Sequence, residues 1–167
     1  MNGERLSFLV TGVGLDARIV AEVEARRHGP ITKSTYVGAG LRALRSYRAP
    51  RLAVEADGAP LEGTFGEVLV SNVVNYAGFR VLSPDRQLDD GLYEVYLFRK
   101  GSLPSLLATG VRALVRGLPG GSCTRIRARR VRITAESPVP CQVDGDAFGT
   151  TPVEFAVHPV QSRLVVP

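Results

Sequence analysis

The sequence contains few of the residues that commonly form disulfides or hold metal ions. Its 167 residues include two cysteines, Cys123 and Cys141, and two histidines, His28 and His158. Two cysteines do not make a disulfide framework, and the four side chains lack the short ligand spacings of a zinc site. We therefore expect neither a disulfide-stabilised fold nor a zinc domain, but a cytoplasmic protein with reduced thiols.

Long apolar runs are also absent. No run approaches the ~20 residues that a membrane-spanning helix needs, and Met1–Arg5 lacks the features of a secretory signal. Hydrophobic residues make up 44% and charged residues 22% of the chain, as in ordinary globular proteins. A chain of this length can bury a sizeable core, so we expect a single domain over residues 1–167.

Acidic residues are outnumbered by basic ones, which gives the chain a formal net charge of +5. Most of the positive charge is arginine, and five arginines fall within Arg125–Arg132. Such a strand can contact anionic lipid or nucleic-acid phosphates, but no Tyr or Phe is interleaved for base stacking, so nucleic acid is not an expected partner. A solvated edge strand, or a genome that favours arginine, explains the same residues.

The apolar pattern predicts strands interrupted by a few helices. Strands are predicted at 6–10, 52–56, 65–74, 91–98, 124–134, 139–143, 153–157 and 161–166, and helices at about 16–28, 34–47 and 102–118. Without regular βαβ alternation, this order indicates an α+β fold with a largely antiparallel sheet or sandwich. The third helix carries a broad apolar stripe formed by Leu103, Leu106, Leu107, Val111, Leu114 and Val115.

The arginine-rich run changes its alternation partway along. Ile126 and Ala128 lie on one face of a strand, whereas Val131 and Ile133 have the opposite parity. We expect a β-bulge near Arg129 to correct the register.

A glycine-rich turn follows the first predicted strand. Gly12 and Gly14 are separated by one residue, as in a dinucleotide fingerprint, but the third glycine and a parallel βαβ continuation are missing. The turn therefore connects a strand to a helix, and Asp16 is predicted as the helix N-cap.

Two Asp-Gly turns are flanked by alternating apolar residues and predict tight hairpins, at 87–92 and at 142–146. In the first, the Asp90 carboxylate and the backbone carbonyls of Gln87 and Leu92 have the spacing of a site for a hard divalent cation. An Asp-Gly turn without an ion explains the same residues. In the second, Asp144 is expected to stabilise the turn.

Taken in order, these motifs resemble the C-terminal domain of the diacylglycerol kinase and sphingosine kinase superfamily, the bacterial soluble lipid kinases above all. The set consists of the Gly12–Ala17 turn, the Ser71–Phe79 segment with Leu82-Ser83-Pro84, and the two Asp-Gly turns, between about Leu6 and Pro167. The resemblance implies a β-sandwich with helical insertions. It also implies ATP-dependent phosphorylation of a lipid hydroxyl, on diacylglycerol or a sphingoid-type alcohol.

The resemblance also implies roles for individual residues. Asp146 stands where the bacterial lipid kinases have a glutamate that acts as general base. Aspartate keeps the carboxylate, but its side chain is one methylene shorter. Asp16 lies in a segment near the lipid headgroup and would hydrogen-bond a hydroxyl of the acceptor. Gln87, Asp90 and Leu92 match the positions that bind a structural magnesium ion.

The Gly-Gly-Asp-Gly-Thr phosphate loop, which family members carry in an N-terminal nucleotide-binding domain, does not occur in this sequence. We therefore expect the chain to supply the acceptor-binding half of a kinase and to be inactive without a nucleotide-binding domain, which was removed or lies on another chain. Expected cofactors are Mg²⁺ and ATP as co-substrate. The expected partner is a lipid at an anionic membrane surface. We expect the protein to be cytoplasmic and peripheral to the membrane, and the sequence leaves open whether it forms a homo-oligomer.

Two alternatives remain. A non-catalytic lipid- or membrane-binding module of the same family is favoured by the aspartate at position 146 and by the missing loop. A nucleic-acid-binding sandwich, based on the basic strand, is the third reading and the least supported.

Overall fold

The computed structural model describes residues 5–26, 40, 42–43, 47–75, 82, 90–99 and 101–158. Its elements are β1 (Val10–Val13), α1 (Leu15–Ala25), β2 (Leu52–Ala56), β3 (Ala59–Pro60), β4 (Glu67–Ser71), β5 (Tyr93–Phe98), α3 (Leu103–Arg116), β6 (Cys123–Ala128), β7 (Arg130–Ala135), β8 (Pro140–Val143), β9 (Asp146–Thr150) and β10 (Val153–Ala156). No described helix is both long and apolar enough to cross a membrane.

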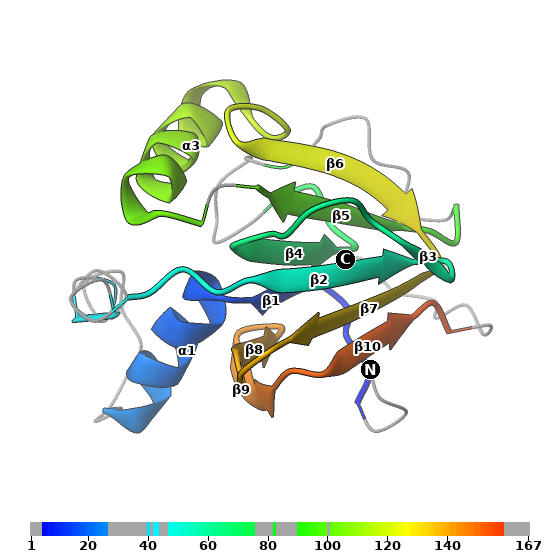
Figure 1. Ribbon diagram of the computed structural model, residues 1–167, viewed down its shortest axis with the longest axis horizontal. Coiled ribbons are helices and arrows are strands. Elements are labelled where there is room, and N and C mark those ends of the chain that lie inside the picture. The colour runs from blue at the N-terminus through cyan, green and yellow to red at the C-terminus, as the bar shows by residue number, and fades with distance from the viewer. Residues whose placement is uncertain are drawn as a thin grey trace, which may run out of the picture.

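Two antiparallel sheets pack face to face (Figure 1). The larger has the strand order β6-β5-β4-β1-β8-β9, and the smaller has the order β10-β7-β2-β3. The main core takes buried side chains from both sheets, among them Val13, Leu52, Val54, Phe65, Val68, Val95, Val131, Ile133 and Phe155. The architecture confirms the predicted α+β fold, a mostly antiparallel β-sandwich with helical insertions.

The larger sheet buries both of its faces around β4 and β5. In β4, Val68 and Val70 point into the main core, whereas Leu69 belongs to a second core. This second core lies against α3 and contains Val10, Leu69, Leu82, Tyr96, Phe98, Ala113, Leu118 and Cys123. Burial on both faces explains why β4 and β5 are apolar runs without alternation.

The first strand differs from its prediction. β1 begins at Val10 rather than Leu6 and continues through Gly12 to Val13. The reason is that the amides of Phe8, Leu9 and Val10 donate to the Asp144 carboxylate. They are therefore unavailable for a strand ladder before Val10.

The arginine-rich segment forms two strands in different sheets rather than one strand with a bulge. The chain leaves the larger sheet after Ala128 and enters the smaller sheet at Arg130, where β7 pairs with β2 and β10. Ala128 and Val131 both point into the main core, which accounts for the change of parity. One explanation of the arginines was a solvated edge strand. β6 is an edge strand, but β7 lies inside its sheet.

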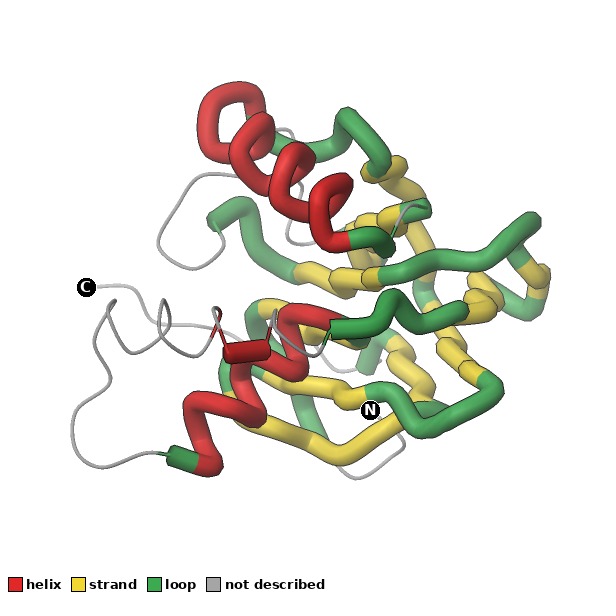
Figure 2. Tube along the Cα trace, turned by 60° about the vertical axis from the view of Figure 1, so that its left-hand side comes forward, coloured by secondary structure: helices red, strands yellow, loops and turns green. Residues whose placement is uncertain are grey.

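One prediction about the helices is wrong. The N-cap of α1 is Gly14, with a φ of 129°, and Asp16 lies in the first turn instead. The extent of α3 agrees with its prediction, but only part of its apolar stripe faces the core, and Leu107, Val111, Leu114 and Val115 are exposed. Figure 2 shows α1 and α3 at the same end of the sandwich.

The remaining differences are local. The hairpin predicted at 142–146 is confirmed by the antiparallel pairing of β8 with β9, but the apolar pattern predicts no strand over β9 itself, whose residues are mostly exposed or half-buried and include Gly149. The predicted helix at 34–47 falls largely, and the predicted strand at 161–166 entirely, outside the described residues.

Candidate functional site

The N-terminus of α1 lies beside the end of β8. β1 and β8 pair antiparallel, with Gly12 opposite Gln142, and the first turn of α1 folds back over this pair. Asp16 Oδ2 accepts a hydrogen bond of 2.8 Å from Gln142 Nε2. A Cβ atom on Gly12 would collide with the Asp16 carboxylate, so only glycine lets the carboxylate lie over β1.

The same glutamine holds the turn that precedes Asp146. Gln142 Oε1 accepts a hydrogen bond of 2.8 Å from the Gly145 amide, and the residue is only 2% exposed. One buried amide thus connects Asp16 with the β8–β9 turn. Nothing in the local sequence indicates this link, because it depends on the pairing of β1 with β8.

A buried carboxyl group caps the first turn of α1. Glu67, at the start of β4, accepts hydrogen bonds from the backbone amides of Leu15 and Asp16, the latter over 3.2 Å. The amides at a helix N-terminus and the helix dipole attract such a group. Burial, followed by the negative charge of Asp16, raises the pKa of Glu67 well above 4.5, while the two amide bonds act in the opposite direction. No motif in the sequence points to Glu67; its only signal is an acidic residue that opens a buried strand.

Tyr47 completes this buried region. Its hydroxyl donates to the Gly66 carbonyl over 3.3 Å. Burial raises the pKa of Tyr47 above 10, and Glu67 adds to the effect. Tyr47 is therefore a neutral phenol at physiological pH.

Asp144 does more than stabilise its own turn. Its carboxylate accepts hydrogen bonds of 2.8 to 3.0 Å from the Ser7 hydroxyl and from the amides of Phe8, Leu9 and Val10. The residue has a φ of 54°, in the left-handed region that aspartate tolerates better than most residues. Asp144 therefore anchors the segment that leads into β1.

Asp146 is the accessible carboxylate of the turn. It opens β9 with a side chain that is 64% exposed, and it forms an ion pair of 2.6 Å with Arg5. The next residue, Ala147, donates its amide to Glu24 near the end of α1 over 2.8 Å. An exposed ion pair of this kind is weak, typically below ~1 kcal/mol, so the Asp146 carboxylate can exchange Arg5 for another partner.

The predicted magnesium ligands are only partly described. Asp90 Oδ1 accepts a hydrogen bond of 2.9 Å from the Leu92 amide, which supports a turn, while Gln87 lies outside the described residues. The described part of the chain contains no group of three or more His, Cys, Asp or Glu side chains that could hold a metal ion. Among the predicted ligands, Asp90 would supply the carboxylate, and backbone carbonyls and water would supply the other oxygens.

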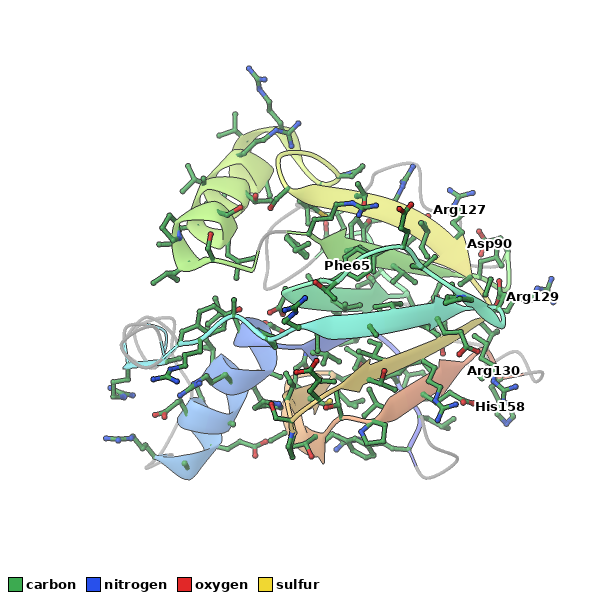
Figure 3. The ribbon with its side chains drawn as sticks, in the orientation of Figure 1. Phe65, Asp90, Arg127, Arg129, Arg130 and His158 are labelled. Carbon is green, nitrogen blue, oxygen red and sulfur yellow. The ribbon has the colours of Figure 1, made fainter. Side chains whose placement is uncertain are left out.

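Asp90 lies far from α1. Figure 3 shows it at the opposite end of the sandwich, together with Arg127, Arg129 and Arg130. An ion held there would stabilise the loop before β5 rather than take part in chemistry beside Asp16.

Two carboxylates form ion pairs with three arginines of the arginine-rich segment. Arg127 and Arg125 contact the fully buried Glu94 over 2.9 and 3.3 Å, and Arg130 pairs with Glu154 over 2.8 Å. The Asp57 carboxylate accepts the backbone amides of residues 129 and 130. The surface along β7 is therefore mixed in charge.

The two cysteines are free and buried. Burial raises the pKa of Cys123 and of Cys141 to about 12. Neither thiol is therefore available as a nucleophile near neutral pH.

Comparisons with known proteins identify the family of the chain. A family model described as the YegS C-terminal NAD kinase beta sandwich-like domain matches residues 9–166. The chain is 25% identical over 148 residues to a diacylglycerol kinase of Bacillus subtilis (strain 168). The aligned residues make up 87% of this chain and 48% of that protein. It is 22% identical over 158 residues to a probable lipid kinase, YegS-like, of Shewanella frigidimarina (strain NCIMB 400), covering 92% of this chain and 50% of that protein.

The fold is similar to a crystal structure of a diacylglycerol kinase from Bacillus anthracis str. Sterne. The TM-score is 0.55 at 13% identity, over 92% of this chain and 50% of that one. The chain thus spans about half the length of the curated relatives that it matches. The family match extends over nearly the whole sequence and confirms the resemblance drawn from the motifs. The chain belongs to the family of the YegS C-terminal NAD kinase beta sandwich-like domain.

Proposed function

We propose that this chain is the acceptor-binding half of an ATP-dependent lipid kinase. It would act on the hydroxyl group of diacylglycerol or of a sphingoid-type alcohol. The names of the relatives support a lipid kinase family. The observation that carries the proposal is the Gln142 bridge, because it joins Asp16 to the turn that presents Asp146.

The exposed Asp146 carboxylate is the proposed general base. The acceptor oxygen attacks the γ-phosphorus of ATP, the bond from that phosphorus to the ADP oxygen breaks, and the hydroxyl proton passes to Asp146. Asp16 would hold the acceptor in place through a hydrogen bond from a hydroxyl other than the attacking one, which a sphingoid-type alcohol has and diacylglycerol lacks. Because positioning contributes most to phosphoryl transfer, the buried amide that fixes Asp16 bears directly on the rate.

ATP and magnesium have separate places in this proposal. A nucleotide-binding domain, preceding this one or supplied in trans, would hold ATP. The Asp90 carboxylate and the carbonyls of Gln87 and Leu92 would hold a structural Mg²⁺, whose charge stabilises their loop. The protein would be cytoplasmic and would meet its lipid at an anionic membrane surface.

A non-catalytic lipid-binding module is the second candidate. Aspartate at position 146 is one methylene shorter than the glutamate that the family resemblance implies, and its carboxylate is paired with Arg5. Both features would suit a domain that retained the fold and lost phosphoryl transfer.

A phosphate-transfer assay separates the two candidates. The chain is tested alone and fused to the nucleotide-binding half of a relative, with detergent-solubilised diacylglycerol as the acceptor. We expect no turnover by the chain alone and measurable turnover by the fusion. In the fusion, Asp146→Asn should lower the rate roughly 10²-fold or more, the size typical of losing a general base, and Asp146→Glu should match or exceed the unaltered fusion.

Glu136→Gln is the matched control, because it removes another exposed carboxylate, at the end of β7. Full activity of the Asp146→Asn fusion would remove Asp146 from the mechanism. A folded fusion that binds diacylglycerol and ATP without turnover would favour the non-catalytic module.

A further inference from the structure

The outer face of α3 carries an exposed apolar surface. Leu107, Val111, Leu114 and Val115 are 50%, 65%, 58% and 81% exposed. Their spacing of four, seven and eight residues places them on one face of a helix. Figures 1 and 2 show α3 at the periphery, and no other described element covers its outer side.

The fold does not require this face. The opposite side of α3 contributes Ala113 and Leu106 to the second core, and the Thr109 hydroxyl lies 3.0 Å from that of Ser122. α3 is thus attached through one side. Solvent-exposed apolar surface of this kind typically marks a site of interaction with a membrane or another protein.

The stretch of sequence that contains α3 carries charges of one sign. No Asp or Glu occurs between Glu94 and Glu136, whereas Arg99, Lys100, Arg112, Arg116 and the arginines of β6 and β7 fall within that stretch. α3 itself carries Arg112 and Arg116 and no acidic residue. Apolar side chains bordered by cations are typical of helices that lie in the interface of an anionic bilayer.

We propose that α3 docks this domain onto an anionic lipid bilayer, which identifies the partner surface of the proposed function and rests on it. Leu107, Val111, Leu114 and Val115 enter the headgroup region, and Arg116 contacts lipid phosphates. With 14 residues, α3 is shorter than the ~20 needed to cross a bilayer, so it lies along the interface.

A second copy of the chain fits this face less well. A symmetric contact through α3 would bring Arg112 and Arg116 close to the same arginines of the other copy. The arginine-rich segment is also a weaker candidate for lipid contact than α3. The single carboxylate of Glu94 holds both Arg125 and Arg127, and Glu154 pairs with Arg130, so these side chains are already engaged within the fold.

Vesicle sedimentation of the 167-residue chain without ATP tests the proposal. We expect binding to vesicles of phosphatidylglycerol and phosphatidylcholine, with much weaker binding to phosphatidylcholine alone. The double variant Val111→Glu with Val115→Glu should weaken binding on the order of 10-fold or more, because it removes two apolar side chains that would enter the bilayer and adds negative charge.

The matched control is Leu6→Glu with Leu9→Glu. These two residues are 59% and 52% exposed and lie outside α3. The control changes apolar surface and charge in the same way and should leave vesicle binding unchanged. Circular dichroism and melting curves check that each variant folds.

A fluorescent reporter gives an independent measurement. The chain contains no tryptophan, so Val115→Trp introduces a single one. Its emission should shift to the blue on anionic vesicles and be quenched by brominated lipid, whereas the emission of Leu6→Trp should not change.

Several results would overturn the proposal. These are equal binding to neutral vesicles, equal loss of binding in the two double variants, or no shift in Val115→Trp. Dimerisation of the unaltered chain that Val111→Glu with Val115→Glu abolishes, without vesicle binding, would assign the face to self-association. Because sedimentation needs no phosphoryl transfer and the kinase assay uses solubilised lipid, each proposal can fail without the other.

Discussion

Gln142 Nε2 donates a hydrogen bond of 2.8 Å to Asp16 Oδ2, although 126 positions separate the two residues in the sequence. The antiparallel pairing of β1 with β8 brings them together, and the other end of the same amide holds Gly145. This one side chain therefore sets the position of the first turn of α1 relative to the β8–β9 turn.

We predict that Gln142→Leu lowers the free energy of unfolding by about 1–3 kcal/mol, the usual cost of leaving a buried polar group without its partner. The leucine removes the donor to Asp16 and the acceptor for the Gly145 amide. Urea denaturation measures the change. Gln142→Glu keeps the acceptor but brings a second carboxyl group against Asp16, so its loss of stability should shrink as the pH falls. A pH-independent difference would argue against contact with Asp16.

Asp144→Ala should lower the free energy of unfolding by about 2–3 kcal/mol, because four hydrogen bonds to a carboxylate are lost and alanine is less tolerant of a positive φ. Asp144→Asn should cost less, since asparagine keeps one acceptor oxygen and accepts this backbone conformation. The matched control is the neighbouring Asp146→Ala, which removes only an exposed ion pair and should cost below ~1 kcal/mol. Equal losses at the two positions would contradict the anchoring role of Asp144.

The raised pKa of Glu67 predicts a pH effect on stability. The folded state holds the carboxyl proton to a higher pH than the unfolded state, which releases it near 4.5. Stability contributed by Glu67 is therefore full below that value and is lost as the pH rises toward the folded pKa. Glu67→Gln cannot titrate, so its melting temperature relative to the unaltered protein should rise as the pH increases above about 4.5.

The control for this experiment is Glu62→Gln, which changes an exposed carboxylate. It should follow the pH profile of the unaltered protein. The same profile for Glu67→Gln would mean that Glu67 is ionised in the fold, held by the amides of Leu15 and Asp16.

Magnesium should raise the melting temperature of the chain, because an ion that binds only the folded state stabilises it by mass action. Asp90→Ala should abolish the increment. Asp57→Ala is the matched control, since Asp57 also precedes glycine in a turn and should leave the increment intact even if it lowers the starting temperature. An equal increment in Asp90→Ala would exclude Asp90 as a ligand.

Local patterns predicted those parts of the fold that depend on neighbouring residues. The alternation of Leu52, Ala53 and Val54 correctly predicts β2, and Asp57-Gly58 correctly predicts its hairpin turn, where both residues have positive φ. In these cases, burial and turn geometry are determined by a few consecutive residues.

The candidate site was only partly predictable. Its two carboxylates, Asp16 and Asp146, follow from the family resemblance, but the contacts of Glu67 and Gln142 depend on strands that are far apart in the sequence. The apolar stripe of α3 shows the opposite limit. Periodicity identifies an apolar face of a helix but does not say whether that face packs against the rest of the protein. In α3, only one side packs in the second core, and the other apolar side is exposed.

The passage of the chain from Ala128 to Arg130 has a consequence for folding. β6 and β7 are almost continuous, yet they belong to different sheets, and their partners come from segments far apart in the sequence. Neither sheet can be completed until this stretch is fixed in both. We therefore expect the sandwich to fold slowly as one cooperative unit, with amide hydrogens of the two sheets exchanging through the same global opening.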